Sequence, residues 1–300
     1  MKIKKFLNSK EGIELSIIIV NFNSVEFITR CLNYILKNKP KTSFEIIVVD
    51  NDSKDNSVGI IRKDFPEVKL IENSSNFGFS YANNQGIVRS NGRYILILNP
   101  DTIVTAGAMD TLINFMRVHP DAGVAGAKML NFDGSIQYSC RRYPTLLNVF
   151  FGRQSFFTKF FPYNRISKRY LMMDEDYSKN MEVDWVFGAS MLIRRKAIED
   201  VGIFDEDYFI FVEDTDLCYR MMEKGWKIYF VADAVIFHHL GVTRDRYWKI
   251  TLPNHNIGMF KFFQKRYKPN PLIQFLLFAG LSLRLLVLVF IKTVNSFLGS

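Results

Sequence analysis

The sequence predicts an α/β fold, in which helices flank a mostly parallel central sheet and an apolar helical appendage follows at the C-terminal end. Runs of β-branched residues alternate with helical stretches over residues 15–98, which indicates βαβ units. These runs lack a polar alternation, as is typical of strands buried on both faces. A second apolar stretch, over residues 272–291, predicts the appendage.

The first half of the chain contains four expected strands, over residues 15–20, 45–50, 68–71 and 94–98. Helical stretches over residues 25–37, 56–63 and 80–89 separate them. Right-handed crossovers bring the loops that follow parallel strands to one edge of the sheet. We therefore expect the polar residues there to converge, namely Asn21, Asp50, residues 73–76, Asn99 and Asp101. Each one singly is better explained as a helix cap, but their number favours a ligand site.

The second half of the chain has less regular periodicity. Strands are expected over residues 122–129, 188–193 and 226–237, and helices over residues 195–201 and 213–224. A turn at residues 131–134 leads into residues 135–139. An aromatic and basic region follows, over residues 141–173, without clean periodicity. An irregular surface insertion and a lid that faces the acceptor or the membrane both account for it.

Length and composition limit the class of protein. Three hundred residues that are 48% hydrophobic bury a sizeable core, as one large α/β domain with appendages or as two unequal domains. Three cysteines without metal-type spacing argue against a zinc site or a disulfide framework and favour a reducing compartment. Neither a Gly-x-Gly-x-x-Gly after the first strand nor a Walker-type Gly-Lys-Ser/Thr is present, which argues against a dinucleotide dehydrogenase and a P-loop phosphotransferase.

The net charge favours a polyanionic partner. A formal charge of +9 suits nucleic acid, anionic lipid or a phosphorylated metabolite. Nucleic acid is the weakest of these partners, because no nucleic-acid-binding motif accompanies the charge. Residues 1–10 are basic but lack an apolar segment of signal-peptide length, so we expect the protein to stay inside the cell.

The apolar stretch over residues 272–291 is interrupted only by Gln274, Ser282 and Arg284, and several lysines and arginines precede it. Its length permits a membrane span. A charge near the middle of a span costs about 2.5–3.5 kcal/mol, so Arg284 favours a helix that lies in the membrane plane. A true span and a core or oligomer helix stay open as alternatives.

The strand expected over residues 94–98 ends in Asn99-Pro100-Asp101, at an edge where open α/β sheets bind ligands. Mg²⁺ or Mn²⁺ takes one or two carboxylates together with phosphate oxygens and water, which suits Asp101 and a nucleotide diphosphate. Asn99 would reach the metal through water or hold a sugar hydroxyl. His238 or His239, at the end of another strand, suits a third ligand; a capped strand end or a buried polar contact is the alternative.

Glu213, Asp214 and Asp216 open the helix expected over residues 213–224. The helix dipole favours acids in the first turn, which explains one or two of them as helix starters. Three acids in four positions exceed that need, and mutual repulsion in a cleft raises a carboxylate pKa toward that of a useful base. The sequence therefore predicts a cleft that holds both a metal site, which binds the diphosphate of the electrophilic donor, and a base.

Several motifs occur in a specific order between about residues 15 and 242. They are residues 16–23, Asp50-Asn51-x-Ser53, Asn76-Phe77-Gly78, Ala82-x-Asn84-x-Gly86, Asn99-Pro100-Asp101, Gly188-Ala189, Glu213-Asp214-x-Asp216 and His238-x-x-Gly241. Each motif is weak alone, but the ordered set resembles the inverting glycosyltransferases of family two, which have the GT-A (Rossmann-like) fold. The resemblance is greatest to the bacterial rhamnosyltransferase-like branch that builds cell-surface polysaccharides.

The resemblance implies a role for each matching residue. The donor-binding residues would be Asn21, Asn23, Asp50, Asn76, Gly78, Asn99 and Asp101, with Asp50 on the pyrimidine ring. Asp101 matches the metal-binding acid of an Asp-x-Asp motif whose first acid is Asn99 here, and His238 matches the late metal or diphosphate ligand better than His239. Asp214 matches the catalytic base, with Glu213 as the second candidate.

The acceptor side follows from the same resemblance. Gly188 and Ala189 would admit the acceptor close to the backbone. Arg141 and Arg142 would contact the diphosphate of a lipid-linked acceptor, although a solvated surface position explains them equally simply. Residues 1–130 and 131–242 would form the nucleotide-sugar-binding and acceptor-binding halves of one domain, and residues 243–300 a membrane-associating region.

The implied reaction is a single displacement with inversion, in which Asp214 deprotonates an acceptor hydroxyl and Mg²⁺ or Mn²⁺ stabilises the departing diphosphate. A dTDP-linked rhamnose is the favoured donor; UDP-linked hexoses and N-acetylhexosamines stay open. The expected acceptor is a lipid-linked or growing cell-surface glycan, and the expected location is the cytoplasmic face of the cell membrane, peripheral or monotopic. The alternative is a non-catalytic protein that binds nucleotides at the membrane surface. Whether the C-terminal region pairs two copies into a homo-oligomer stays open.

Overall fold

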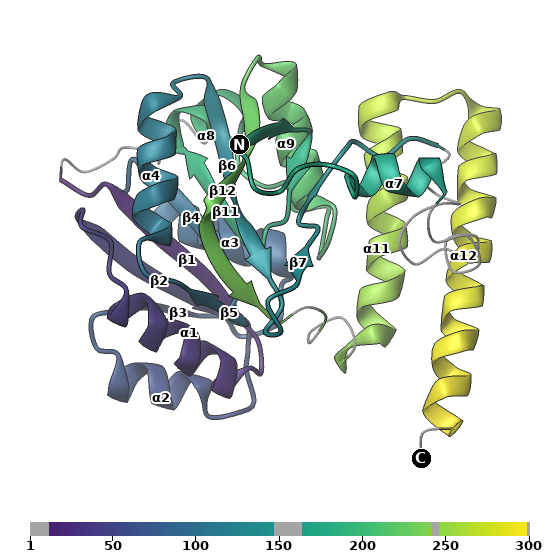
Figure 1. Ribbon diagram of the computed structural model, residues 1–300. Helices are drawn as coiled ribbons and strands as arrows, with labels where there is room; N and C mark the ends of the chain where they lie inside the picture. Colours follow the sequence, from purple (N-terminus) through teal and green to yellow (C-terminus); the bar gives the residue numbers. More distant parts are fainter. Residues whose placement is uncertain (1–11, 147–163, 240, 242–245, 299–300) are drawn as a thin grey trace.

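The computed structural model describes residues 12–146, 164–239, 241 and 246–298. A ten-stranded sheet has the order β3-β2-β1-β4-β11-β6-β12-β5, with β7 paired to β6 and β9 paired to β12 (Figure 1). The strands are β1 (Leu15–Asn21), β2 (Phe44–Asp50), β3 (Lys69–Glu72), β4 (Tyr94–Leu98), β5 (Thr102–Val104), β6 (Ala122–Leu130), β7 (Ile136–Gln137), β9 (Met181–Val183), β11 (Ser190–Arg194) and β12 (Lys227–His238). A small separate sheet pairs β8 (Cys140–Arg141) with β10 (Trp185–Val186).

Helices cover both faces of this sheet (Figure 1). They are α1 (Val25–Lys37), α2 (Ser57–Asp64), α3 (Phe79–Arg89), α4 (Ala108–Val118), α8 (Arg195–Val201) and α9 (Glu213–Glu223). The short helix α7 (Arg165–Leu171) contacts β8 and lies away from the large sheet (Figure 1). After the sheet come α11 (Trp248–Phe262), a π-helical turn (Phe263–Tyr267) and α12 (Pro271–Leu298). The expected α/β architecture is confirmed.

The sheet is mixed but mostly parallel. Strands β1 to β4 pair in parallel and β12 pairs in parallel with β6, whereas β11 is antiparallel to both β4 and β6. The carboxyl ends of β1, β4 and β12 and the amino end of β11 therefore lie at one edge of the sheet. In Figure 1 the arrowheads of β6 and β12 point toward this edge. The polar residues after the first strands meet there, as expected.

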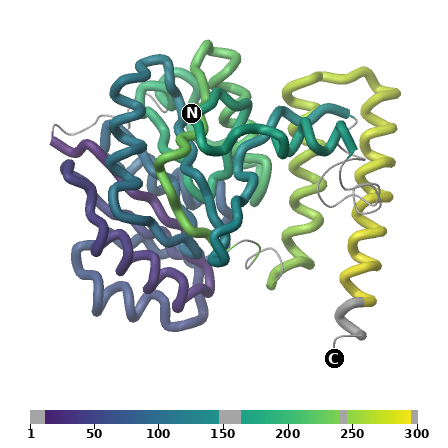
Figure 2. Tube along the Cα trace, in the orientation of Figure 1, coloured from purple at the N-terminus to yellow at the C-terminus, as the bar shows by residue number. Residues whose placement is uncertain are grey.

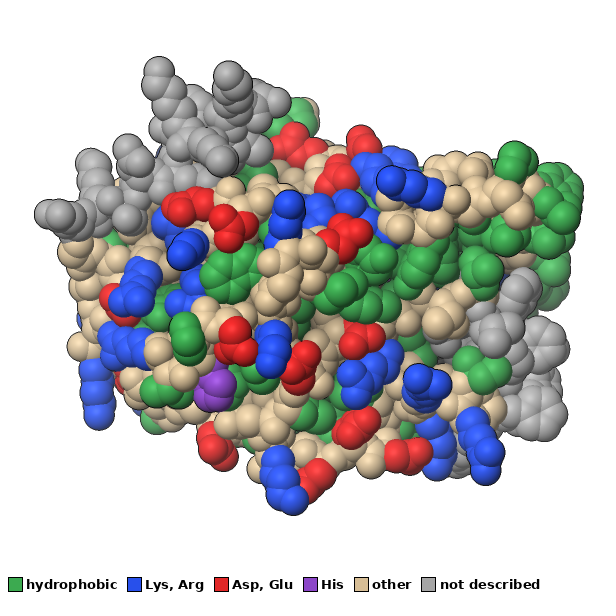
Figure 3. Space-filling view, turned by 90° about the horizontal axis from the view of Figure 1, so that it is seen from above, with side chains coloured by type: hydrophobic (Ala, Val, Ile, Leu, Met, Phe, Trp, Pro, Cys, Tyr) green, Lys and Arg blue, Asp and Glu red, His purple; other side chains and the backbone are tan. Residues whose placement is uncertain are grey.

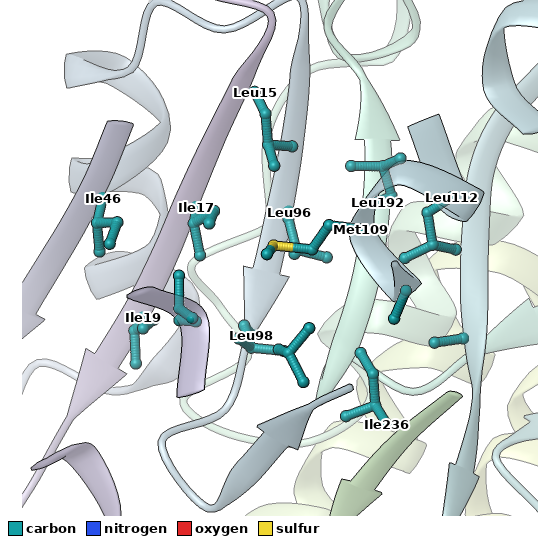
Figure 4. Packing of buried hydrophobic residues seen from close by; sticks show 14 of the residues in the cluster. Leu15, Ile17, Ile19, Ile46, Leu96, Leu98, Met109, Leu112, Leu192 and Ile236 are labelled. Carbon is teal, nitrogen blue, oxygen red and sulfur yellow. The ribbon is translucent and has the colours of Figure 1, made fainter. Parts of the chain in front are cut away.

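Alternating residues of the central strands fill two cores. Ile17 and Ile19 face one side with Leu96 and Leu98, where Met109 and Leu112 of α4 cover them (Figure 4). Ile18, Ile95 and Ile97 face the other side and pack with residues of α8 and α9. Burial on both faces explains why these strands are continuous apolar runs. Each fully buried side chain of this size contributes about 1.5–3 kcal/mol, so the sheet is a rigid base for the loops at its edge.

The C-terminal helices lie beside the sheet, with α11 between the sheet and α12 (Figure 2). Leu277 and Leu281 of α12 are buried in a cluster with Met259, Phe262 and Phe263. The opposite face of α12 exposes an apolar stripe, formed by Leu272, Phe275, Leu276, Leu283, Leu286 and Phe290. Seen from above in Figure 3, hydrophobic side chains gather at the end of the molecule where these helices lie.

Several elements differ from the sequence-based expectation. Helix α4 was not expected, although Met109, Leu112, Ile113 and Met116 recur at helical spacing. Helix α11 was also not expected, and it contains Pro253. Part of the irregular region forms β8 and α7. The remainder of that region, residues 147–163, and the basic residues 1–11 lie outside the described residues.

Candidate functional site

The loops after β1 and β2 form a tightly bonded platform. The Asn21 side chain donates hydrogen bonds to Asp50 Oδ2 (2.7 Å) and Ser53 Oγ (3.1 Å). The Ser53 amide donates to Asp50 Oδ1 (2.9 Å), so both oxygens of this buried carboxylate are already oriented. Asn23 has φ 46° and binds the next loop through its own amide and side chain. Asn21 and Asp50 therefore meet at this edge and Asn23 lies beside them, while their role in donor binding stays a prediction.

A cluster of asparagines lies beside this platform, at the same edge of the sheet. Asn51 donates to Asn76 Oδ1 (3.2 Å) and to the Gly78 carbonyl (3.1 Å), while Asn73 donates to Asn51 (2.8 Å). Gly78 has φ 90°, and a Cβ atom there would lie 2.5 Å from the Phe209 carbonyl oxygen. Only glycine permits this close approach. The loop at Asn76 and Gly78 therefore packs directly on the chain that leads to the acidic cluster.

A hollow of about 710 Å³ adjoins the first loop. Its lining is made of Asn23, Ser24, Val25, Glu26, Phe27, Lys54, Asp55, Arg246 and Tyr247. Arg246 also donates to the Asn23 carbonyl (3.2 Å). Two cations, Lys54 and Arg246, thus lie in a cavity next to the residues expected to hold a nucleoside, but Asp101 and Asp214 are not part of its wall.

Asp101 and His238 meet because of strand pairing. Strand β5 begins directly after Asp101 and runs antiparallel to β12, with Thr102 opposite His238. The His239 amide donates to the Asp101 carbonyl (3.0 Å), which fixes the two chain segments together. His238 Nε2 then lies 3.4 Å from Asp101 Oδ1, and both side chains are buried. The His239 ring instead lies edge-on to Phe27 and tilted against Phe132, so of the two histidines His238 is the one that faces Asp101.

The residues at this point suit a hard divalent cation. Asp101 Oδ1 is buried without a hydrogen-bond donor, and a basic ring nitrogen faces it. An unsatisfied buried carboxylate oxygen is costly unless a cation or a ligand satisfies it. Among the described residues no three His, Cys, Asp or Glu side chains form a metal site, so the protein would supply two ligands and substrate oxygens and water the rest.

The three acids of α9 have three different environments. Asp216 is fully buried and is bound by Arg220 (2.9 Å) and Arg266 (2.7 Å), so it holds the structure together. Glu213 is buried with Oε2 lacking a hydrogen-bond partner, and burial, followed by the charge of Asp214, raises its pKa well above the usual value. Asp214 is the acid that faces the loop before β11.

Asp214 combines partial exposure with firm positioning. Its Oδ2 accepts a hydrogen bond from the Gly188 amide (3.0 Å), and its Oδ1 accepts one from the Thr215 amide (2.7 Å). Burial raises the pKa of Asp214, while these donors oppose the rise. The residues before it, Phe211 and Val212, have φ 67° and 72°. Two consecutive non-glycine residues in the left-handed region are strained, and such strain is often found at functional sites.

Short links connect the two acids. The Asn99 amide donates to the Ala189 carbonyl (3.0 Å), and the neighbouring Gly188 amide binds Asp214. A Cβ atom at Gly188 would lie 3.7 Å from Asp214 Cβ, so a larger side chain would crowd the acid. Asp101 and Asp214 therefore lie at the same sheet edge, on either side of the Gly188-Ala189 backbone.

Arg141 and Arg142 already have partners in the structure. The Arg141 guanidinium is buried, donates to the carbonyls of Tyr138 and Cys140, and lies over the Phe187 ring. Arg142 is half exposed and pairs with Asp184 (3.2 Å) and Glu175 (3.8 Å). Their expected contact with an acceptor diphosphate stays a prediction.

One buried polar residue next to the metal-ligand candidates was not expected from the sequence. Gln137 lies in β7. Its Nε2 donates a hydrogen bond to the His238 carbonyl (2.7 Å), and its Oε1 lies 2.9 Å from His238 Nδ1. The sequence carries no signal for it, because a glutamine in a short segment after a turn is ordinary.

A mixed sheet, a platform of loops after β1 and β2, and acids at the carboxyl edge are typical of nucleotide-sugar-dependent transferases with the GT-A fold. The chain belongs to the glycosyl transferase family 2, whose model matches residues 16–202. The expected membership of this family is confirmed, and the protein is a glycosyltransferase.

Named relatives place the chain within the family. It is 28% identical over 233 residues to an N-acetylglucosaminyl-diphospho-decaprenol L-rhamnosyltransferase of Mycobacterium tuberculosis, which covers 74% of this chain and 75% of that protein. It is also 28% identical to the rhamnosyltransferase WbbL of Escherichia coli, over 74% of this chain and 82% of that one. The mannosyltransferase PcManGT of Pyrobaculum calidifontis, solved with GDP-Man and Mn²⁺, has the same fold, with a TM-score of 0.57, 18% identity and coverage of 90% and 70% of the two chains.

Proposed function

We propose that the protein is an inverting glycosyltransferase that moves a sugar, preferably rhamnose, from a dTDP- or UDP-linked donor to a lipid-linked glycan acceptor. The observation that carries the proposal is the placement of Asp101, His238 and Asp214 at one edge of the sheet, where the backbone of residues 188–189 links the two acidic segments. Two of the relatives that match this chain are named as rhamnosyltransferases, and the name of one of them contains a diphospho-decaprenol carrier.

The donor side follows from the platform at the sheet edge. Asn21, Asp50 and the Asn76–Gly78 loop would hold the nucleoside, because their oxygens and amides are fixed before a ligand arrives. Asp101 and His238 would hold a divalent cation such as Mg²⁺ or Mn²⁺. That cation would neutralise the charge that develops on the departing diphosphate.

The acceptor side follows from Asp214. Its carboxylate would accept the proton of the acceptor hydroxyl, and its raised pKa brings it closer to the range of an effective base. The Gly188 and Thr215 amides hold this carboxylate in one orientation, so the hydroxyl is deprotonated as it attacks the anomeric carbon. Attack from the face opposite the leaving group inverts that carbon. Glu213 is an unsuitable base because it is buried away from solvent.

Membrane association would bring the enzyme to its acceptor. Residues Pro271–Val294 of α12 form a helix long and apolar enough to cross a membrane by length and composition, with 11% of its most apolar window buried. The face with Leu277 and Leu281 packs on α11, and the apolar stripe faces outward. A helix attached to the protein along one side suits in-plane insertion at the cytoplasmic face better than a span.

The substitution D214N tests the proposed reaction. Loss of a general base lowers turnover by about 10²–10⁴-fold, whereas donor binding should stay nearly unchanged. Nucleotide release would be measured with dTDP-rhamnose, UDP-hexoses and UDP-N-acetylhexosamines, with lipid extract as acceptor. The substitution D207N, at an exposed acid, is the matched control and should stay near the parent rate. Near-normal turnover of D214N would refute the base assignment.

A further inference from the structure

Gln137 lies between the turn after β6 and the proposed metal ligand His238. Its side chain is buried, and its Nε2 donates to the His238 carbonyl (2.7 Å) and to Asn131 Oδ1 (2.8 Å). A primary amide has two hydrogens, so these two bonds use both of them. The remaining atom, Oε1, lies 2.9 Å from His238 Nδ1.

The direction of these hydrogen bonds follows from two groups that can only accept hydrogen bonds, the Asp133 carboxylate and the His238 carbonyl. The Asp133 carboxylate accepts from Ser135 Oγ (2.6 Å), so Ser135 Oγ must in turn accept from Asn131 Nδ2 (2.8 Å). This leaves Asn131 Oδ1 as an acceptor facing Gln137. Hydrogen bonds from Ser135 keep the pKa of Asp133 below its usual value, which is consistent with a permanent acceptor.

The opposite orientation of the Gln137 amide would be unfavourable. Its oxygen would face two acceptors, the His238 carbonyl and Asn131 Oδ1, at hydrogen-bond distance. Gln137 Oε1 therefore faces His238 and accepts a hydrogen bond from Nδ1–H. A neutral imidazole with a hydrogen on Nδ1 has its lone pair on Nε2, the atom 3.4 Å from Asp101 Oδ1.

We propose that Gln137 is a positioning residue that holds His238 in the tautomer with hydrogen on Nδ1, so that Nε2 is free to bind the divalent cation of the donor diphosphate. This role rests on the proposed function. Partners that orient a metal-binding histidine contribute about 10–100-fold to metal affinity. The turn at residues 131–135, which the sequence predicts only as a turn, then sets the chemistry of the sheet edge through Gln137.

The tautomer can be observed without any metal. Long-range ¹H–¹⁵N NMR spectra of ¹⁵N-histidine-labelled protein distinguish a protonated from an unprotonated ring nitrogen. The chain has four histidines, and the signals that disappear in H238N identify His238. We expect hydrogen on Nδ1 in the parent protein and a shift toward hydrogen on Nε2 in Q137L. Hydrogen on Nε2 of the neutral ring in the parent protein would overturn the proposal.

Metal affinity gives the second measurement. Mn²⁺ would be titrated with UDP or dTDP present and followed by electron paramagnetic resonance. Q137L should weaken Mn²⁺ binding about 10–100-fold. Q264L, at an exposed glutamine of the π-helical turn, is the matched control and should bind as the parent does.

The outcomes separate this role from the proposed function. Parent-like Mn²⁺ affinity in Q137L would overturn the role of Gln137 alone. Absence of Mn²⁺ binding in the parent protein would overturn the metal assignment and the role of Gln137 with it. Thermal unfolding of each variant, followed by circular dichroism, ensures that affinities are compared between folded proteins.

Discussion

Arg266, in the π-helical turn after α11, donates to the carboxylate of Asp216 at 2.7 Å, two residues beyond the proposed base Asp214. Asp216 also accepts from Arg220 (2.9 Å) and Tyr208 (3.2 Å), and it is fully buried. The C-terminal helices are therefore attached to the first turn of α9, the helix that carries the proposed base Asp214.

The substitution R266A tests this attachment. A hydrogen bond to a charged group contributes about 1.5–3 kcal/mol, so R266A should lower the free energy of unfolding by that amount. It should also lower turnover, because the first turn of α9 loses one of its supports. Urea unfolding and nucleotide release measure the two effects. K265A removes ion pairs with Asp205 and Asp207, which are at least partly exposed, and a cation–π contact with the Tyr208 ring, and it should cost about 1 kcal/mol or less. Equal losses in both variants would show that Arg266 has no special role.

Gly258 of α11 permits a close approach to the strained turn before Asp214. A Cβ atom at Gly258 would lie 3.2 Å from both the Phe211 carbonyl oxygen and Val212 Cγ2. G258V should therefore displace the turn and lower turnover with little change in donor affinity, and G258A should have a smaller effect. Overpacking of this kind costs about 1–3 kcal/mol.

The matched control for Gly258 is I257A, on the exposed face of the same helix, where the side chain is 50% exposed. I257A should leave turnover unchanged. Kinetic assays over a range of donor concentration separate turnover from affinity. An unaltered turnover number in G258V would mean that α11 does not constrain the catalytic turn.

Glu213 should make stability depend on pH. Burial and the nearby Asp214 raise its folded-state pKa above the unfolded value, so the folded protein holds this proton more tightly. Its contribution is most favourable below the unfolded pKa and is lost as the pH rises through the raised pKa. E213Q removes the ionisation, and its advantage over the parent in free energy of unfolding should grow from about pH 4.5 upward.

Urea unfolding of both proteins at intervals between pH 4 and 8 measures this difference. The exposed residue Glu26 provides the control, because E26Q should follow the parent curve across the range. A constant offset between E213Q and the parent would refute the assignment of the pH effect to Glu213.

The sheet was predictable because its central strands are recognisable in the sequence as short apolar runs. Residues 15–20 and 94–98 are mostly apolar and rich in isoleucine, and tertiary structure buries them on both faces. The strand at β11 was expected, but its antiparallel direction was not, because direction depends on a chain path that a local pattern does not encode. Helix α4 has a helical period in its buried residues Met109, Leu112 and Met116, but it was not predicted from the sequence.

The candidate site was predictable to the extent that its residues lie at strand and helix ends. Asp101, His238 and Asp214 each follow or begin a regular element, so motif order and topology bring them together. The different roles of Asp214 and Asp216 were not predictable, since they depend on Arg266, which lies 50 residues further along the chain. Gln137 was equally hidden, because its importance comes from contacts with Asn131 and His238 across the fold.

The apolar stripe of α12 should carry membrane binding. Phe275, Leu286 and Phe290 are 66%, 68% and 70% exposed, and an exposed apolar face of this length is stable only against lipid or another apolar surface. The triple substitution F275S/L286S/F290S should remove about 1.5–3 kcal/mol of burial per residue and abolish sedimentation with vesicles of anionic phospholipid. V118S, at a 72% exposed valine of α4, is the matched control and should sediment as the parent does. Sedimentation of the triple variant at the parent level would exclude this stripe as the membrane contact. Release of the parent protein from vesicles by alkaline carbonate would support in-plane insertion, and resistance to it would support a span.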